Sequence, residues 1–138
     1  MKNLHALLIA ILSTTSVCHA ADSVPAAVSN KLKSMAGANS EDCGSVPLGS
    51  DHNAAIACAK NAASAGKAYR VAIQFQGTGS LVWQGAARNE QGKLWMLFYD
   101  MDISDGSGAS PTLSTLPCRE IRFDVPGGDL IDCQPTSS

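Results

Sequence analysis

Residues 69–99 read YRVAIQFQGTGSLVWQGAARNEQGKLWMLFY, and their pattern indicates the fold class of this chain. Apolar and polar side chains alternate over residues 69–76, a period of two that is typical of a strand with one buried face. A Gly-Thr-Gly turn at residues 77–79 leads into a second alternating stretch, and a turn at residues 89–92 leads into a third. The third stretch, residues 94–99, is apolar on both faces, as in the middle of a sheet or beneath a helix. These residues predict an antiparallel meander.

The meander is predicted to continue after a long interruption. Residues 101–116 are rich in Gly, Ser, Pro and Asp, and we expect an irregular loop of a length that is often functional. Ile121, Phe123 and Val125 then alternate with charged residues, which predicts a further strand. A turn at residues 126–129 and a short return strand at residues 130–133 complete the sheet.

Two helices are predicted before the sheet. Val28, Leu32 and Met35 recur at helical spacing within residues 25–36, and Gly37 ends that segment. Residues 53–65 are dense in alanine, so this second helix is thin enough to lie close to a sheet. Ser50 or Asp51 can cap it. We expect residues 38–49, between the helices, to form a loop.

The predicted fold class is therefore α+β, with one or two N-terminal helices packed on a four- to five-stranded antiparallel meander sheet. The alanine-rich helix is expected to cover one face and to leave the other partly exposed. No repeat or linker divides residues 21–138, which are expected to form a single domain.

Residues 1–20 have the features of a secretory signal. Lys2 precedes an apolar run at residues 4–12, and Cys18-His19-Ala20 offers a signal-peptidase site, so we expect cleavage after Ala20. A lipid anchor on Cys18 is the alternative, but the preceding residues 15–17 do not fit a lipidation motif. We expect a periplasmic or secreted, soluble product without a stable membrane anchor, because no second apolar stretch approaches the length of a spanning helix.

Four cysteines follow the predicted signal, an even number that indicates two disulfides in an oxidising compartment. Three pairings are possible. The spacing favours Cys43–Cys58 and Cys118–Cys133, each of which closes a loop of about 16 residues and stabilises by on the order of 3 kcal/mol. A zinc site is the alternative, but the close C-x-x-C pairs that it needs are absent from the sequence.

Cys118 presents a conflict within this scheme. In a regular strand Cys118 would share a face with Glu120, Arg122 and Asp124, which is the polar side of its predicted strand. Either a β-bulge near Cys118 switches the face, or the disulfide lies on the outer face. We favour the bulge.

Composition limits the chemistry. The charges nearly balance and no basic face is visible, which argues against nucleic-acid binding. His52 is the only histidine after the predicted signal, so a metal centre built on several histidines is excluded. A Ser-His-Asp triad would have to use His52, and it lacks a G-x-S-x-G context. We expect no catalytic set and no cofactor.

Asp100, Asp102 and Asp105 are the strongest polar candidates for a binding site. Their spacing resembles a calcium loop, but the third acid is one position late and no glutamate closes the motif, so we assign no metal. A solvated acidic turn is the plainer interpretation. Two of these acids could also serve a carboxylate-dependent hydrolase as general acid and base, although the chain has few aromatics to hold a sugar.

Trp83, Trp95 and Tyr99 are the aromatic candidates for a binding site. Trp95 and Tyr99 share a strand face, with Trp83 on the neighbouring strand. Core packing accounts for them if a helix covers that face; otherwise they form an aromatic patch of the kind enriched at protein interfaces.

Function is predicted from architecture alone. The chain resembles small exported bacterial binders, namely inhibitors of cell-wall enzymes and immunity proteins against toxins, which are compact, disulfide-bonded and non-catalytic. This resemblance implies a protein partner in the cell envelope. A carboxylate-dependent hydrolase and a purely structural envelope protein are the alternatives.

Overall fold

The computed structural model describes residues 23–103, 110–126 and 130–137. These residues form two helices and one six-stranded sheet, so the chain has the predicted α+β fold. The predicted signal peptide and its cleavage site after Ala20 lie outside the described residues. In chain order the elements are α1 (Ala26–Ala36), β1 (Glu41–Val46), α2 (Asn53–Ser64), β2 (Tyr69–Gln76), β3 (Ser80–Arg88), β4 (Leu94–Asp102), β5 (Thr112–Phe123) and β6 (Ile131–Pro135).

The central strands follow the predicted meander. β2, β3 and β4 pair antiparallel in sequence order with a continuous register, in which Gln74, Trp83 and Tyr99 lie side by side. Gly77 N–H donates to the carbonyl of Ser80 across the first turn, at 2.9 Å. The alternation that predicts these strands thus also sets which side chains share a face.

The predicted loop at residues 38–49 is wrong over Glu41–Val46, which form β1. This strand pairs parallel with β2, so the sheet is mixed and has six strands, where four or five antiparallel strands were expected. Parallel neighbours need a crossover connection, and α2 supplies it between β1 and β2. Within β1 only Cys43 is buried, so the strand shows little of the alternation that identifies a strand in sequence.

The predicted irregular loop at residues 101–116 is also wrong at both of its ends. β4 continues to Asp102, and β5 already begins at Thr112. β5 pairs with β4 from Thr112 to Cys118. Residues 104–109, between these strands, lie outside the described residues.

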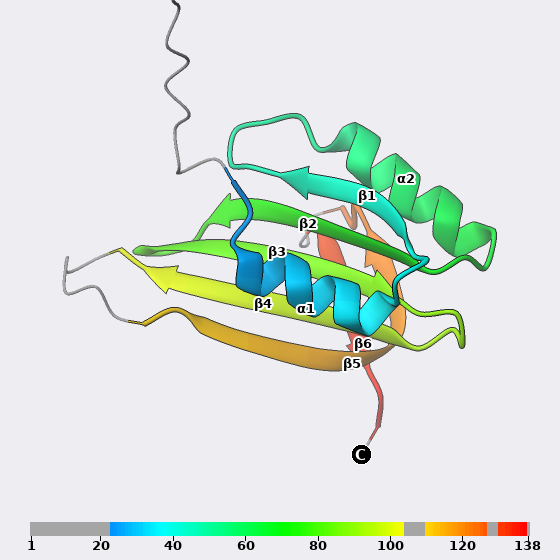
Figure 1. The fold of residues 1–138 in the computed structure, drawn as a ribbon. Helices are drawn as coiled ribbons and strands as arrows, with labels where there is room; N and C mark the ends of the chain where they lie inside the picture. The colour runs from blue at the N-terminus through cyan, green and yellow to red at the C-terminus, as the bar shows by residue number, and fades with distance from the viewer. Residues whose placement is uncertain (1–22, 104–109, 127–129, 138) are drawn as a thin grey trace, which may run out of the picture.

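The two helices cover opposite faces of the sheet, and Figure 1 shows α1 lying across β3 and β4 on the near face. Val28, Leu32 and Ala36 of α1 form one core with Trp83 and Leu97. α2 packs on the other face over β1 and β2, where its apolar side chains meet Tyr69 and Val71. The second face was expected to be partly exposed, and α1 covers its central part.

β5 bends and carries the chain back over the α2 side of the sheet. Its first half (gold in Figure 1) lies at the lower edge of the sheet, whereas its second half (orange) turns behind the sheet beside β6. The buried Gln84 side chain of β3 donates to the carbonyl of Ile131 in β6 at 2.8 Å. Lys60 of α2 forms an ion pair with Asp124 at 2.8 Å, which ties the end of β5 to the helix.

Both disulfides form in the pairing that the spacing favours, Cys43–Cys58 and Cys118–Cys133. The first joins β1 to α2, and the second joins β5 to β6. The register of β5 against β6 is irregular between Cys118 and Glu120, and Cys118 is buried in the core. The favoured interpretation, a bulge that switches the face near Cys118, is therefore confirmed.

Candidate functional site

The acidic residues lie at one end of the sheet. Asp100 and Asp102 are both exposed near the end of β4, on the same face as Met96 and Phe98. Across the strands Asp100 faces Val82 and Thr112, and Asp102 faces Ser80. Asp105 lies outside the described residues. The structure therefore places two of the three predicted acids on one face of one strand.

A shallow hollow of about 380 Å³ adjoins these two acids. Its lining is polar and consists of Thr78, Gly79, Ser80, Asp100, Asp102, Ser110 and Thr112. Asp100 and Asp102 are both exposed residues beside a polar hollow, whereas a carboxyl that acts as a general acid at neutral pH is usually held in an apolar pocket. The hollow can accept cationic or hydroxylated groups, but its described residues contain no histidine, cysteine or aromatic ring that would complete a catalytic set.

The aromatic candidates have different environments. Trp83 is 1% exposed beneath α1 and belongs to the core, so the aromatic patch that was the alternative interpretation does not form at this residue. Tyr99 faces Trp83 across the strands and packs on the edge of the same core, with part of its side chain exposed. Trp95 is also half-buried, and it lines a groove with Pro117 and Cys118.

Exposed large apolar side chains lie along the edge of the sheet that β4 and β5 form. Among the described residues, four large hydrophobic side chains are exposed: Leu48 (46%), Ile103 (49%), Leu113 (37%) and Leu116 (37%). The last three lie just after β4 or in the first half of β5. Leu113 faces Tyr99 across the strands on the α1 side of the sheet, and Leu116 lies on the other side. We call Tyr99, Ile103, Leu113 and Leu116 the β4–β5 surface.

The same part of β5 is an open edge of the sheet. β6 pairs with β5 only from Cys118 onward. In the part of the chain that the structure describes, no strand therefore lies on the outer side of residues 112–116, which we call the free edge. Unpaired backbone groups of this kind are a template on which another strand can pair. Thr136 N–H donates to the carbonyl of Pro117 at 3.3 Å and so closes one end of the free edge.

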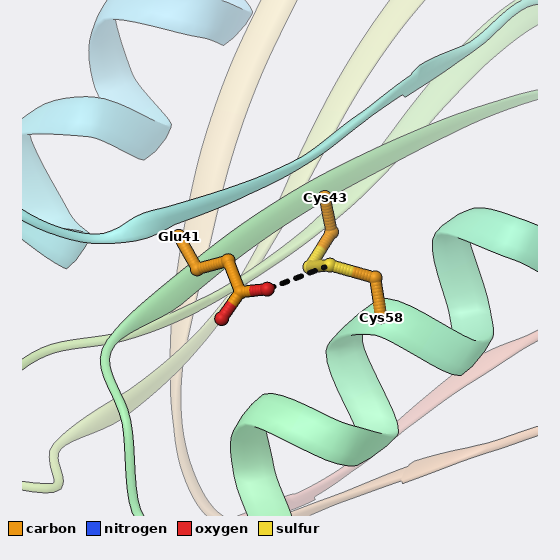
Figure 2. Close-up of side chains that lie close together, drawn as sticks. All are labelled: Glu41, Cys43 and Cys58. Atoms are coloured by element: carbon orange, nitrogen blue, oxygen red, sulfur yellow. Dashed lines mark hydrogen bonds between the residues drawn. A yellow bond between two sulfur atoms is a disulfide. The ribbon is translucent and has the colours of Figure 1, made fainter.

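A carboxylate lies against the first disulfide. Glu41 Oε1 is 3.6 Å from Cys58 Sγ, and Figure 2 shows the Glu41 side chain extending from β1 towards the bond between Cys43 and Cys58. A disulfide sulfur carries no proton, so this contact brings negative charge next to the bond and is not a hydrogen bond. Glu41, Cys43 and Cys58 also form a group of three potential metal ligands among the described residues. The two sulfurs are bonded to each other, and zinc binds thiolates, so the oxidised protein cannot hold zinc there.

The sequence interpretation missed three of the four residues of the β4–β5 surface, because it assigned Ile103, Leu113 and Leu116 to an irregular loop. A signal was present. The segment Thr112-Leu113-Ser114-Thr115-Leu116 lies between two prolines and contains two β-branched threonines, which favour strands. The preceding Gly, Ser and Asp residues obscured it. Glu41 was missed because it comes close to Cys58 only after β1 and α2 have packed together.

Comparison with known protein families, curated proteins and solved structures finds no match to this chain. In the described part of the chain, neither helix has the length and apolar character needed to cross a membrane. The two disulfides are consistent with an extracellular or otherwise oxidising compartment.

Proposed function

We propose that the chain is an exported, non-catalytic protein-binding module that acts in the periplasm or outside the cell, as an inhibitor or immunity-type protein does. The observation that carries this proposal is the row of exposed apolar side chains along the β4–β5 edge of the sheet. Three of the four large hydrophobic side chains exposed among the described residues belong to the β4–β5 surface. Leu113 lies on the α1 side and Leu116 on the other, so a partner that covers both must dock along this edge.

The surroundings of the β4–β5 surface support protein recognition. Tyr99 packs against the α1 core and is partly exposed, and tyrosine is among the residues enriched at the energetic centres of interfaces. Asp100 and Asp102 add negative charge at the rim, which would speed association with a cationic partner. The free edge adds backbone donors and acceptors for a partner in an extended conformation.

The proposal can be tested by capture of partners from a cell-envelope extract on the immobilised protein. Leu113→Ser and Leu116→Ser should each weaken partner binding by about five- to thirtyfold, because truncating an interface anchor costs on the order of 1–2 kcal/mol. Leu48→Ser is the matched control, since Leu48 has similar exposure but lies outside the β4–β5 surface. Equal loss in all three variants, or no loss in any, would contradict the proposal.

The hollow beside Asp100 and Asp102 supports a second candidate, a small carboxylate-dependent hydrolase. Turnover of glycoside or ester substrates by the purified protein, abolished in Asp100→Asn and retained in Leu113→Ser, would establish this candidate. Under the binding proposal no turnover is expected, and Asp100→Asn weakens only the association with a cationic partner.

A further inference from the structure

The backbone of the free edge has a defined set of outward-facing groups. Ile103 N–H donates to the carbonyl of Gly79, and this bond continues the pairing of β4 with β3. Because backbone groups alternate in direction along a strand, the N–H and C=O groups of the odd-numbered residues of β4 point towards β3. Even-numbered residues of β4 therefore point towards β5. In the antiparallel pairing, Asp100 lies opposite Thr112 and Phe98 opposite Ser114. The even residues of β5 are thus satisfied by β4, and Leu113 and Thr115 direct their N–H and C=O groups outward.

Pro117 agrees with this assignment. It is an odd-numbered residue, and its carbonyl accepts a hydrogen bond from Thr136 on the outer side of the strand. A proline in a sheet is tolerated where its missing N–H would face away from the neighbouring strand. Pro117 and Pro111 therefore limit the donor-bearing part of the edge to the five residues between them.

The two prolines that bound the free edge are placed symmetrically about its central residue, Ser114. Residues 111–117 read PTLSTLP, with prolines at equal distances on either side of Ser114. Residues 110–117 contain no charged side chain, so two copies of this segment can approach without repulsion between like charges. Charged side chains are a common means by which edge strands avoid pairing with another chain, and this edge lacks them.

We propose that the free edge of β5 pairs antiparallel with the free edge of a second copy of this chain, about a two-fold axis at Ser114. In this register Leu113 lies opposite Thr115 of the second copy, and Thr115 lies opposite its Leu113. These are the residues whose backbone groups face outward, so each pair exchanges two hydrogen bonds. The two Ser114 residues then face each other as a non-hydrogen-bonded pair, with Cα atoms about 4.5 Å apart.

Pairing in this register places the exposed leucines against the second copy. Leu116 neighbours Thr112 of the other chain on one face, and Leu113 neighbours its Thr115 on the other. The inference names one partner of the surface assigned under the proposed function, and it rests on that proposal. A five-residue pairing is much smaller than a standard interface, so we expect a weak dimer that forms at high micromolar concentration. Ile103 and Asp100 lie outside the pairing and stay accessible to a different protein.

A cysteine at the symmetry axis tests this geometry directly. In Ser114→Cys the two new thiols face each other within the Cα range that a disulfide spans, so mild oxidation should give a covalent dimer. Thr112→Cys is the matched control on the same exposed strand. In the proposed register its two copies lie four positions apart, about 13 Å, and no rapid cross-link should form. Equal cross-linking of the two variants would overturn the register.

Sedimentation of the full chain over a concentration series provides the second measurement. The unmodified protein and Ser114→Asn should show the same weak dimerisation. Ser114→Asp, its charged isostere, should remain monomeric at every concentration, because it brings two negative charges together at the axis. An unmodified protein that stays monomeric throughout would overturn the inference. If the protein is monomeric and Leu113→Ser reduces capture of another protein, the proposed function stands and its partner is not a second copy. If the protein dimerises but captures nothing from the envelope, the proposed function fails and the inference stands.

Discussion

Gly85 allows α1 to lie close against β3, and replacing it with alanine should destabilise the protein. A Cβ atom at this position would lie 2.9 and 3.1 Å from the two Cδ atoms of Leu32, and 3.3 Å from the carbonyl oxygen of Val71. The Val71 carbonyl belongs to the backbone of β2 and cannot move without disturbing the sheet. Leu32 is 2% exposed and enclosed by the α1 core, so it has little room to change rotamer.

The size of the effect follows from two opposing contributions. Overpacking of a core costs about 1–3 kcal/mol. Alanine restricts the conformations of the unfolded chain more than glycine does, and this offsets about 0.4–1 kcal/mol of the loss in stability. We expect Gly85→Ala to lower the free energy of unfolding by about 1.5 kcal/mol. For a chain of this size that corresponds to a decrease in Tm of roughly 6 °C.

A double-mutant cycle with Leu32 attributes the loss to this contact. Leu32→Ala alone should cost about 3 kcal/mol, because it leaves a cavity. In the Gly85→Ala background the new methyl group occupies part of that cavity, so Leu32→Ala should cost only about half as much. Urea unfolding with both disulfides intact gives the four free energies. If Gly85→Ala is neutral, or if the two losses add within about 0.5 kcal/mol, the packing argument is wrong.

Two further predictions concern Tyr69 and Glu41. Burial raises the pKa of Tyr69 to about 12, so the folded state holds this proton more tightly than the unfolded state. The contribution of this proton to the free energy of unfolding is complete below pH 10 and falls between pH 10 and 12 by at most about 1.4 kcal/mol per pH unit. Urea unfolding at several pH values should show this decline as a change in the stability difference between the unmodified protein and Tyr69→Phe. A stability difference that does not change with pH would contradict the prediction. The negative charge of Glu41 repels a thiolate that attacks Cys58. Glu41→Gln should therefore speed the reduction of Cys43–Cys58 by glutathione about fivefold at low salt. This factor corresponds to the repulsion of about 1 kcal/mol between two like charges about 4 Å apart in water. Cys118–Cys133 is the internal control, and an equal acceleration of both bonds would count against a local charge effect.

Much of the fold is encoded locally. The helical spacing of Val28, Leu32 and Met35 and the alternation after Tyr69 depend only on which side of one element each residue occupies. Such patterns can be read without knowledge of the neighbouring elements. The disulfide pairing was also predictable, because each bond closes a short loop between adjacent elements.

The candidate site was less predictable. Asp100 and Asp102 were identified from their side-chain chemistry, and the structure places both on one exposed face at the end of β4. Whether Trp83 was core or surface could not be read from the strand pattern, because that depends on α1 lying across it. Leu113 and Leu116 became candidates only when their exposure on an edge strand was visible.

The α+β class, the two helices, the central meander and the two disulfides could be predicted from the sequence, because periodicity and short loop closure are properties of neighbouring residues. Two features required the packed structure: residues 41–46 form a parallel edge strand, and the first half of β5 has no outer neighbour among the described residues. Edge strands bury few side chains, so their own pattern is weak. Their conformation depends on hydrogen bonds to a strand that is distant in the sequence. The partner strand cannot be identified from the sequence of the edge segment alone.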